Sequence, residues 1–146
     1  MNMKYYSIND IAMMTGFTTR TLRNYINLGI LEGEKIDGVW RFSEENFNAF
    51  LSDVNVIASL KTKRNAHVFN FLLDDKKQEN NICTILDFYV DDEEAATIST
   101  FFCEQMNDGN KSNTHFTFYR NGKNTRVILS GPEDIVTDIM RKYYTK

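Results

Sequence analysis

The feature that most constrains this chain is a pair of short helix patterns near its start, separated by a glycine. Ser7 is a good N-cap residue, and Asp10 three positions later can complete a capping box. Apolar residues then recur at helical spacing as far as Gly16, where a left-handed backbone is easiest to adopt. Thr18 opens a second helix pattern, and Gly29 ends it. The pattern predicts two helices joined by a tight turn.

The second helix pattern has two faces of different chemistry. Leu22, Tyr25 and Ile26 form an apolar face that can enter a core. The opposite face carries side chains that bind phosphates and base edges: Thr19, Arg20, Arg23, Asn24 and Asn27. A helix with these two faces is typical of the second helix of a helix-turn-helix motif, which enters the major groove of DNA.

A hairpin and a third helix are predicted after this pair. Asp37 and Gly38 are a strong hairpin turn signal, so two short strands meeting there would form a wing. Ser43 can cap a third helix, with Asn46 at its third position. A short helical stretch is expected near residues 53–61. Residues 61–65, which are mostly charged and polar, indicate a linker.

The rear half begins with two runs rich in β-branched and aromatic residues, 67–73 and 82–90, which predict strands. A polar loop separates them. Asp91 with Glu94 offers another capping box, and it predicts a helix that ends at about Met106.

Two more strands and a helix are predicted to complete the chain. The runs 114–120 and 125–130 meet at Asn121 and Gly122, which suit a type I′ turn or the start of a longer loop. Pro132 suits the first turn of the last helix. The order ββαββα predicts a four-stranded antiparallel sheet with both helices on one face, and the whole chain is expected to be α+β.

The charge distribution indicates two domains. Residues 1–66 contain eight Lys and Arg against seven Asp and Glu, a net charge of +1, and residues 67–146 contain nine against thirteen, a net charge of −4. A near-neutral domain can still bind DNA if its basic groups share one face. We expect a DNA-binding domain over residues 1–60 and a dimerisation or effector domain over residues 66–146.

The front half, over residues 4–52, resembles the MerR-like winged helix-turn-helix family and the related excisionase-type domains. Residues 6–8 (Tyr-Ser-Ile) precede the first helix as in that family, and residues 21–25 (Thr-Leu-Arg-Asn-Tyr) stand where MerR-type proteins carry Thr-Leu-Arg-Tyr-Tyr. Residues 29–31 (Gly-Ile-Leu) stand where MerR-type proteins carry Leu-Gly-Leu, after the Thr-Leu-Arg-Tyr-Tyr stretch. The wing, residues 38–42 (Gly-Val-Trp-Arg-Phe), is more similar to the Gly-x-Trp-Arg-Phe of excisionase-type domains.

The resemblance implies roles for the side chains of the second helix. Arg23 would clamp a phosphate. Thr19 and Arg20 are candidates for base edges, Arg20 favouring guanine, although Arg20 could equally be a second phosphate contact. Tyr25 could offer its hydroxyl group to a phosphate while its ring packs in the core, or it could serve the core alone.

The wing supplies the remaining candidates. Lys35 and Arg41 would meet the DNA backbone or the minor groove, and Trp40 is expected to anchor the packing of the wing rather than to act as a wedge. The full set of candidate DNA-binding residues is Ser7, Thr18, Thr19, Arg20, Arg23, Asn24, Tyr25, Lys35, Trp40 and Arg41.

Several other classes of site are not expected. The chain has no GxSxG, no phosphate-binding glycine loop and no HExxH, so no enzyme, catalytic residue or cofactor is expected. Cys83 and Cys103 lack ligand spacing, so they predict buried or half-buried thiols rather than a metal site or a disulfide. The metal-loop cysteines of MerR-type sensors are missing. His67 and His115 are expected to be structural or surface residues. Without an apolar run of roughly 18 residues or a secretory segment, we expect a cytoplasmic protein with no membrane partner.

These features predict a sequence-specific, MerR-like transcription regulator that binds double-stranded DNA as a homodimer through its rear half. The alternative is an excisionase-like architectural protein, an accessory factor of a mobile element that bends DNA. A third hypothesis gives the rear half a small-molecule effector, with strand aromatics lining its pocket. Sheet core and dimer packing are the other use for those aromatics: Phe69, Phe71, Phe88, Tyr89, Phe116, Phe118 and Tyr119.

Overall fold

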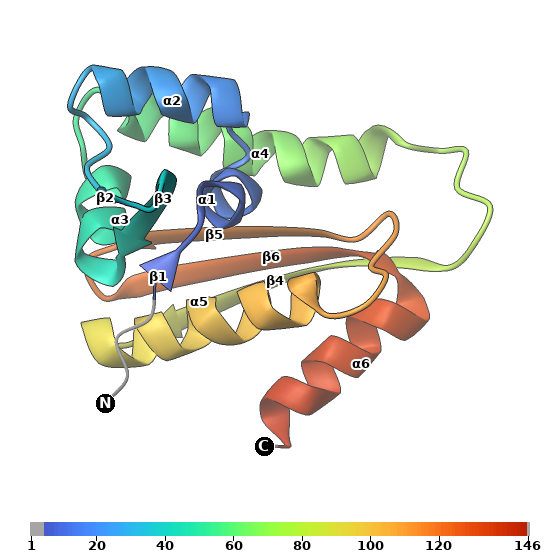
Figure 1. The fold of residues 1–146 in the computed structure, drawn as a ribbon. Helices are drawn as coiled ribbons and strands as arrows, with labels where there is room; N and C mark the ends of the chain where they lie inside the picture. The colour runs from blue at the N-terminus through green and yellow to red at the C-terminus, as the bar shows by residue number, and fades with distance from the viewer. Residues whose placement is uncertain (1–4, 146) are drawn as a thin grey trace.

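A computed structural model describes residues 5–145 of the chain; the first four residues of the predicted front domain and Lys146 lie outside them. The protein is α+β, with helices and two antiparallel three-stranded sheets (Figure 1). In chain order the elements are β1 (Tyr5–Tyr6), α1 (Ile8–Thr15), α2 (Thr19–Asn27), β2 (Glu34–Ile36), β3 (Val39–Ser43), α3 (Glu44–Leu51), α4 (Ile57–Leu73), β4 (Asn81–Tyr89), α5 (Asp92–Asn107), β5 (His115–Asn121), β6 (Asn124–Pro132) and α6 (Glu133–Tyr144).

Local capping signals position the first helices as expected. The Ser7 hydroxyl accepts a hydrogen bond from the Asp10 N–H at 3.0 Å, and the Asp10 carboxylate accepts one from the Ser7 N–H at 3.1 Å. Gly16 ends α1 with φ +84°, in the left-handed region that favours glycine. Ser43 and Asn46 form the equivalent box at the start of α3. The capping box predicted at Ser7 and the N-cap predicted at Ser43 are confirmed.

The small sheet has the strand order β1-β3-β2, with both pairs antiparallel. Asp37 and Gly38 join β2 to β3, and both have positive φ, +52° and +79°, as a type I′ turn requires. The predicted hairpin at these two residues is therefore confirmed. It projects next to α2 and α3 at one end of the molecule (Figure 1).

The large sheet has the order β4-β6-β5 and three strands, so the prediction of four strands is wrong. Residues 67–73, predicted to form the first strand, are the last two turns of α4. Their aromatic and branched residues suggested β structure, but Leu60, Arg64, His67 and Phe71 continue one helical face, and no glycine or proline interrupts the segment.

The linker predicted over residues 61–65 is also wrong, because these residues lie inside α4. The short helical stretch expected at residues 53–61 is in fact a helix of 17 residues. Its polar residues are the solvent-facing side of a helix that packs on the sheet. Arg64 instead lies on the packed side of the helix, with its guanidinium carbon 3.5 Å from the centre of the Tyr119 ring on β5.

The hairpin between β5 and β6 differs slightly from the expected turn. Asn121 pairs with Asn124, so the loop residues are Gly122 and Lys123 rather than Asn121 and Gly122. Gly122 has φ +63°, and Lys123 is not in the left-handed region. The turn therefore needs glycine only at its first loop position.

The large sheet separates two layers of helices. Helices α5 and α6 lie against one face, as predicted for the rear half, and α4 lies against the other (Figure 1). Phe102 on α5 stacks on Phe116 of β5 at 5.6 Å between ring centres, and Phe88 of β4 meets Tyr143 of α6 at 5.8 Å. Within residues 5–145, no helix has the combination of length and apolar character needed to cross a membrane.

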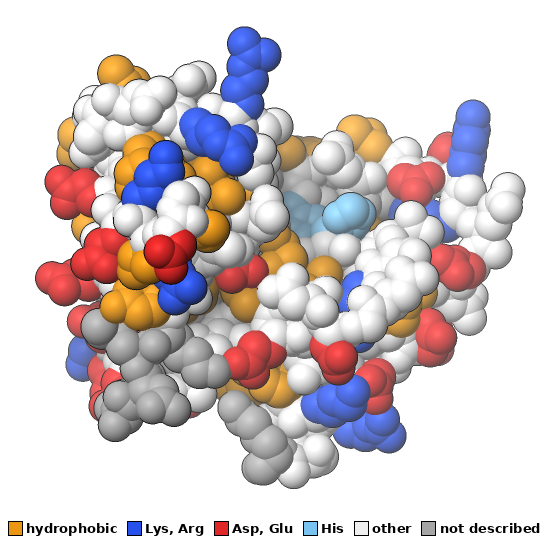
Figure 2. Space-filling model, viewed as in Figure 1, with side chains coloured by type: hydrophobic (Ala, Val, Ile, Leu, Met, Phe, Trp, Pro, Cys, Tyr) orange, Lys and Arg blue, Asp and Glu red, His pale blue; other side chains and the backbone are white. Residues whose placement is uncertain are grey.

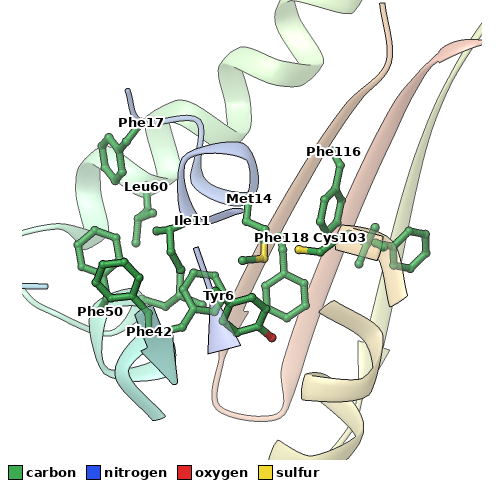
Figure 3. Close-up of a cluster of buried hydrophobic side chains, with 14 of the residues drawn as sticks. Tyr6, Ile11, Met14, Phe17, Phe42, Phe50, Leu60, Cys103, Phe116 and Phe118 are labelled. Carbon is green, nitrogen blue, oxygen red and sulfur yellow. The ribbon is translucent and has the colours of Figure 1, made fainter. Parts of the chain in front are cut away.

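One buried hydrophobic cluster spans the front and rear halves of the chain (Figure 3). The ring of Phe47 on α3 lies 5.9 Å from that of Phe118 on β5, and the hydroxyl groups of Tyr6 and Ser99 are hydrogen-bonded. Figure 3 shows the side chain of Met14 reaching from α1 toward Phe118 of the large sheet, and that of Ile11 pointing toward Phe42 and Tyr6. The small sheet and the large sheet are therefore held together by shared packing.

Both thiols are unpaired, and their predicted burial is confirmed. Cys103 is buried and Cys83 is half-buried. Burial raises the pKa of each thiol, because a thiolate loses solvation in an apolar environment. Each side chain therefore packs as a small neutral hydrophobe.

Candidate nucleic-acid interface

The two faces of α2 are separated as the sequence predicts. Leu22 is fully buried in the core, and Tyr25 and Ile26 pack against it. The Tyr25 ring lies edge-on to two other rings, 5.5 Å from Phe17 and 5.6 Å from Phe50 between centres. These contacts fix the rotation of α2 about its axis, so its opposite face points to solvent.

The solvent face of α2 gathers two cations and two amides. Arg20, Arg23, Asn24 and Asn27 are all exposed, and their spacing of three and four residues places them on one side of the helix. Thr19 is half-buried at the edge of this face. Neither arginine has an ion-pair partner within residues 5–145. Both guanidinium groups are therefore available to an external anion.

The charge of this surface comes from α2 rather than from the wing. Helix α2 contains two arginines and no acidic residue. On the hairpin, Lys35 and Arg41 are balanced by Glu34 and Asp37, and Glu34 is directly opposite Arg41 in the register. Figure 2 shows Lys and Arg side chains over the part of the molecule where α2 lies, with Asp and Glu side chains below them. A polyanion bound at this surface would therefore be attracted more strongly by α2 than by the hairpin.

Two of the predicted site residues use their hydroxyl groups within the protein. Thr18 Oγ1 accepts a hydrogen bond from the Thr21 N–H at 3.1 Å and lies 3.0 Å from the Thr21 hydroxyl. The hydroxyl of Ser7 caps α1. Both residues thus fix where a helix begins, which sets the direction of α1 and α2.

The wing residues are arranged around a ring stack. Trp40 stacks on the buried ring of Phe42, with 6.3 Å between centres and an angle of 13° between planes. Lys35, its partner in the register, places Nζ 5.8 Å from the Trp40 ring. Arg41 is exposed on the other side of β3. The stack keeps Trp40 half-buried, and Lys35 and Arg41 project from opposite faces of the hairpin.

Lys63 is a neighbour of this surface that the sequence placed in a linker. It is exposed on α4, and a Cβ added to Gly16 would come within 3.3 Å of the Lys63 Cβ. It therefore lies beside the turn that leads into α2 and adds positive charge there. Only the continuation of the helical face through residues 60–71 could have revealed this position, because Lys63 is distant from Gly16 in sequence.

A cleft with a volume of about 1110 Å³ lies between α1, α4 and the large sheet, and the histidine side chains are visible in its hollow in Figure 2. Its lining includes Met13, Gly16, Lys63, His67, His115 and Ser130. The His67 ring nitrogens lie 2.6 Å from the Thr117 hydroxyl and 2.7 Å from the Ser130 hydroxyl. Burial, with a smaller contribution from His115, lowers the pKa of His67 to about 4. The ring is therefore neutral at physiological pH.

Among the described residues there is no group of three or more His, Cys, Asp or Glu side chains that could hold a metal ion. No protein-family model matches the chain, and no curated protein or solved structure has significant similarity to it.

Proposed function

We propose that residues 5–51 form a winged helix-turn-helix and that the protein is a sequence-specific regulator of transcription that binds double-stranded DNA. The observation that carries this proposal is the solvent face of α2. Arg20 and Arg23 project together from a helix whose other face is locked in the core, and neither has an ion-pair partner in residues 5–145. Guanidinium groups held in this way match the bidentate geometry of phosphate and guanine acceptors.

In the proposed complex, α2 lies in the major groove. Arg23 binds a phosphate oxygen, and Arg20 reaches the O6 and N7 acceptors of a guanine. The hydroxyl of Tyr25 binds the backbone from the edge of the helix, since its ring is held by Phe17 and Phe50. Lys35 contacts the backbone next to the groove. Phosphate contacts position the protein, and base contacts supply specificity.

One short helix in one groove binds weakly, so we propose that two copies act together. Residues up to 60 would bind DNA, and residues 66–146 would join the two copies. A second copy on a palindromic site converts the second binding event into an intramolecular one with a high effective concentration. The acidic rear half, with a net charge of −4 over residues 67–146, would stay away from the duplex.

Selection from a pool of random duplexes tests this function. We expect an enriched motif with two inverted half-sites separated by about one helical turn, and loss of enrichment in an R20A/R23A double variant. Arg141→Ala is the matched control, because Arg141 is an exposed arginine on α6, paired with Asp138. A pool in which no motif is enriched over the double variant would refute the proposal.

One observation favours the alternative function, an excisionase-like architectural protein. The wing carries a Gly-Val-Trp-Arg-Phe sequence at residues 38–42, and its tip exposes Ile36 and Val39 opposite each other. Apolar residues at a wing tip can enter the minor groove and bend DNA. Circular-permutation gel shifts distinguish the two functions: a bend that is lost in V39S supports the architectural role, and unbent palindromic DNA excludes it.

The cleft supports a small-molecule effector. It touches Ala12 and Met13 of α1 on one side and Thr117 and Ser130 of the large sheet on the other. A ligand that binds one arrangement of these elements more tightly than another shifts their population, and through α1 it would reach α2. A metabolite panel screened by thermal shift, with Ala66→Trp as the variant that fills the cleft, tests this role. Stabilisation of both proteins, or of neither, counts against it.

A further inference from the structure

Strand β4 lies at one edge of the large sheet and is the least covered of its three strands. None of its residues from Asn81 to Tyr89 is buried, whereas most residues of β6 and β5 are. At nine residues it is also longer than an average strand of five to six. Exposed edge strands of this length are normally covered or interrupted in native proteins, because they invite pairing.

The opposite edge of the sheet is protected. Helix α1 packs on β5, and the rings of Phe116 and Phe118 there are part of the core cluster shared with the front half. No strand pairs with the outer side of β4 within residues 5–145. No strand pairs with the outer side of β5 either, but α1 packs against β5, so within residues 5–145 the edge of β4 is the more open to a partner strand.

The hydrogen bonds at the two ends of the β4–β6 pair show which residues of β4 direct their N–H and C=O groups toward β6. The Glu133 N–H donates to the Asn80 carbonyl at 2.8 Å, and the Val90 N–H donates to the Lys123 carbonyl at 3.0 Å. Backbone groups alternate sides along an antiparallel strand, so the even-numbered residues of β4 face β6. The N–H and C=O groups of the odd-numbered residues in Asn81–Tyr89 point outward, to the open edge.

We propose that a second copy of this chain binds here, with the two β4 strands antiparallel and Ile85 on the two-fold axis. This inference rests on the dimer of the proposed function and names its interface. Ile85 is the central residue of Asn81–Tyr89, and its N–H and C=O point outward, so each Ile85 exchanges two hydrogen bonds with its counterpart. The two sheets then join into one continuous six-stranded sheet.

The side chains of β4 are complementary to themselves in this register. Ile85, 48 % exposed, meets its own counterpart and loses apolar surface to water. Asp87 lies opposite Cys83 of the second copy, so no like charges face each other. Arg126 of the same copy already neutralises Asp87 through two hydrogen bonds, of 2.7 and 3.0 Å. Tyr89 lies opposite Asn81 of the second copy.

Helix α4 adds apolar surface on the same side of the sheet. Ile85 shares a cross-strand row with Ile128 and Thr117, and Thr117 is the residue that binds His67 of α4. Side chains in one such row point to one face, so Ile85 and α4 lie on the same face. The last turns of α4 expose three large apolar residues: Phe69, Leu72 and Leu73. We expect these residues to lie near the partner and to be covered in the dimer.

Thiol cross-linking tests the register. In a Cys83→Ser background, which removes the accessible native thiol, Ile85→Cys and Tyr89→Cys are compared with a short bismaleimide. Antiparallel pairing places the two Cα atoms of residue 85 about 5.5 Å apart. The two residues 89 are eight positions apart along the joined strands, about 27 Å at 3.4 Å per residue. We expect cross-linked dimers from I85C and none from Y89C.

A charge at the axis tests the interface itself. Ile85→Lys places two ammonium groups opposite each other, and light scattering should show a monomer at concentrations where the parent is a dimer. Val54→Lys is the matched control, since Val54 is an apolar residue 85 % exposed outside this surface, and its dimer should persist. Circular dichroism verifies that both variants are folded.

The proposed interface would be wrong if the parent protein is a monomer, or if the I85K variant forms a dimer as stable as that of the parent. It would also be wrong if residue 89 cross-links as efficiently as residue 85, because that result indicates parallel pairing or a different partner strand. Failure of the DNA-binding proposal has a different signature. A dimer that cross-links at residue 85 but binds duplex no better than R20A/R23A would refute DNA binding and leave the interface intact.

Discussion

The ring of His67 on α4 is hydrogen-bonded to the hydroxyl of Ser130 on β6, with 2.7 Å between Nε2 and Oγ. The other ring nitrogen bonds Thr117 on β5 at 2.6 Å. In a neutral imidazole one nitrogen donates and the other accepts, and a hydroxyl group can serve either role. These two bonds fasten α4 across two strands of the sheet at the edge of the cleft.

We expect low pH to weaken the attachment of α4 to the sheet through these two hydrogen bonds. The pKa of His67 falls from an ordinary 6.5 to about 4 in the folded protein, so between these values the unfolded chain binds more protons. The contribution of His67 to the free energy of unfolding should therefore be complete above pH 6.5 and should fall as the pH decreases from 6.5 to 4. Because the ring is partly accessible to solvent, we expect a loss on the order of 1 kcal/mol.

Urea unfolding at a series of pH values measures this loss. His67→Gln keeps polar groups near both hydroxyls but does not titrate, so its stability should depend less on pH over the same window. A parent and an H67Q variant with parallel pH profiles would show that His67 does not carry the effect.

The shared core implies that the two halves unfold together. Phe118→Ala removes a buried ring of the large sheet that touches Phe47 of α3, and truncations of this kind cost about 3–5 kcal/mol. Trp40, the single tryptophan of the chain, reports on the small sheet. We expect F118A to lower the urea midpoint of Trp40 fluorescence and of circular dichroism by the same amount. An unchanged Trp40 transition would mean that the halves are independent.

Gly33 is required by the close approach of a ring. A Cβ at this position would lie 2.5 Å from Cδ1 of the buried Phe42 and 2.8 Å from the Arg41 carbonyl oxygen. We expect Gly33→Ala to destabilise the protein by about 1–3 kcal/mol, the cost of overpacking. Gly38→Asn is the control: it has positive φ but open space around it, and asparagine tolerates that conformation. Thermal unfolding should separate the two variants, and equal melting temperatures would contradict the clash.

The front half could be predicted almost to the residue, because its signals are local. A cap such as Ser7, a glycine such as Gly16 and a turn such as Asp37–Gly38 each specify backbone conformation within a few residues. The amphipathic period of α2 was equally informative, since Leu22 and Arg23 are about 100° apart around any helix and so lie on different sides of it. These signals do not depend on the rest of the fold.

Helix α4 could not be predicted in the same way. Its second half is rich in residues that favour strands, such as Val68 and Phe69, and it has no side-chain cap at its start. Tertiary contacts stabilise this segment as a helix, because Leu60 is buried in the core and His67 is hydrogen-bonded to the sheet. Because this helix was not predicted, Lys63 was assigned to a linker, and residues 67–73 were assigned to a fourth strand of the large sheet.

Arg20 and Arg23 should differ in what they contribute to DNA binding. If Arg20 reads a guanine, Arg20→Ala should reduce discrimination between the selected site and its base-substituted variants by about 1–3 kcal/mol at that position. Competition binding with duplexes altered one base pair at a time measures this. A uniform loss over all sequences would instead assign Arg20 to a phosphate.

The salt dependence of Arg23→Ala tests the central claim most directly. Duplex affinity is measured for the parent, R23A and R141A at several salt concentrations. If Arg23 binds a phosphate, R23A should bind every sequence more weakly, and the slope of log K against log salt should fall by about one unit, while R141A keeps the parent slope. If R23A and the parent have the same affinity and the same slope, the solvent face of α2 is not a DNA-binding surface.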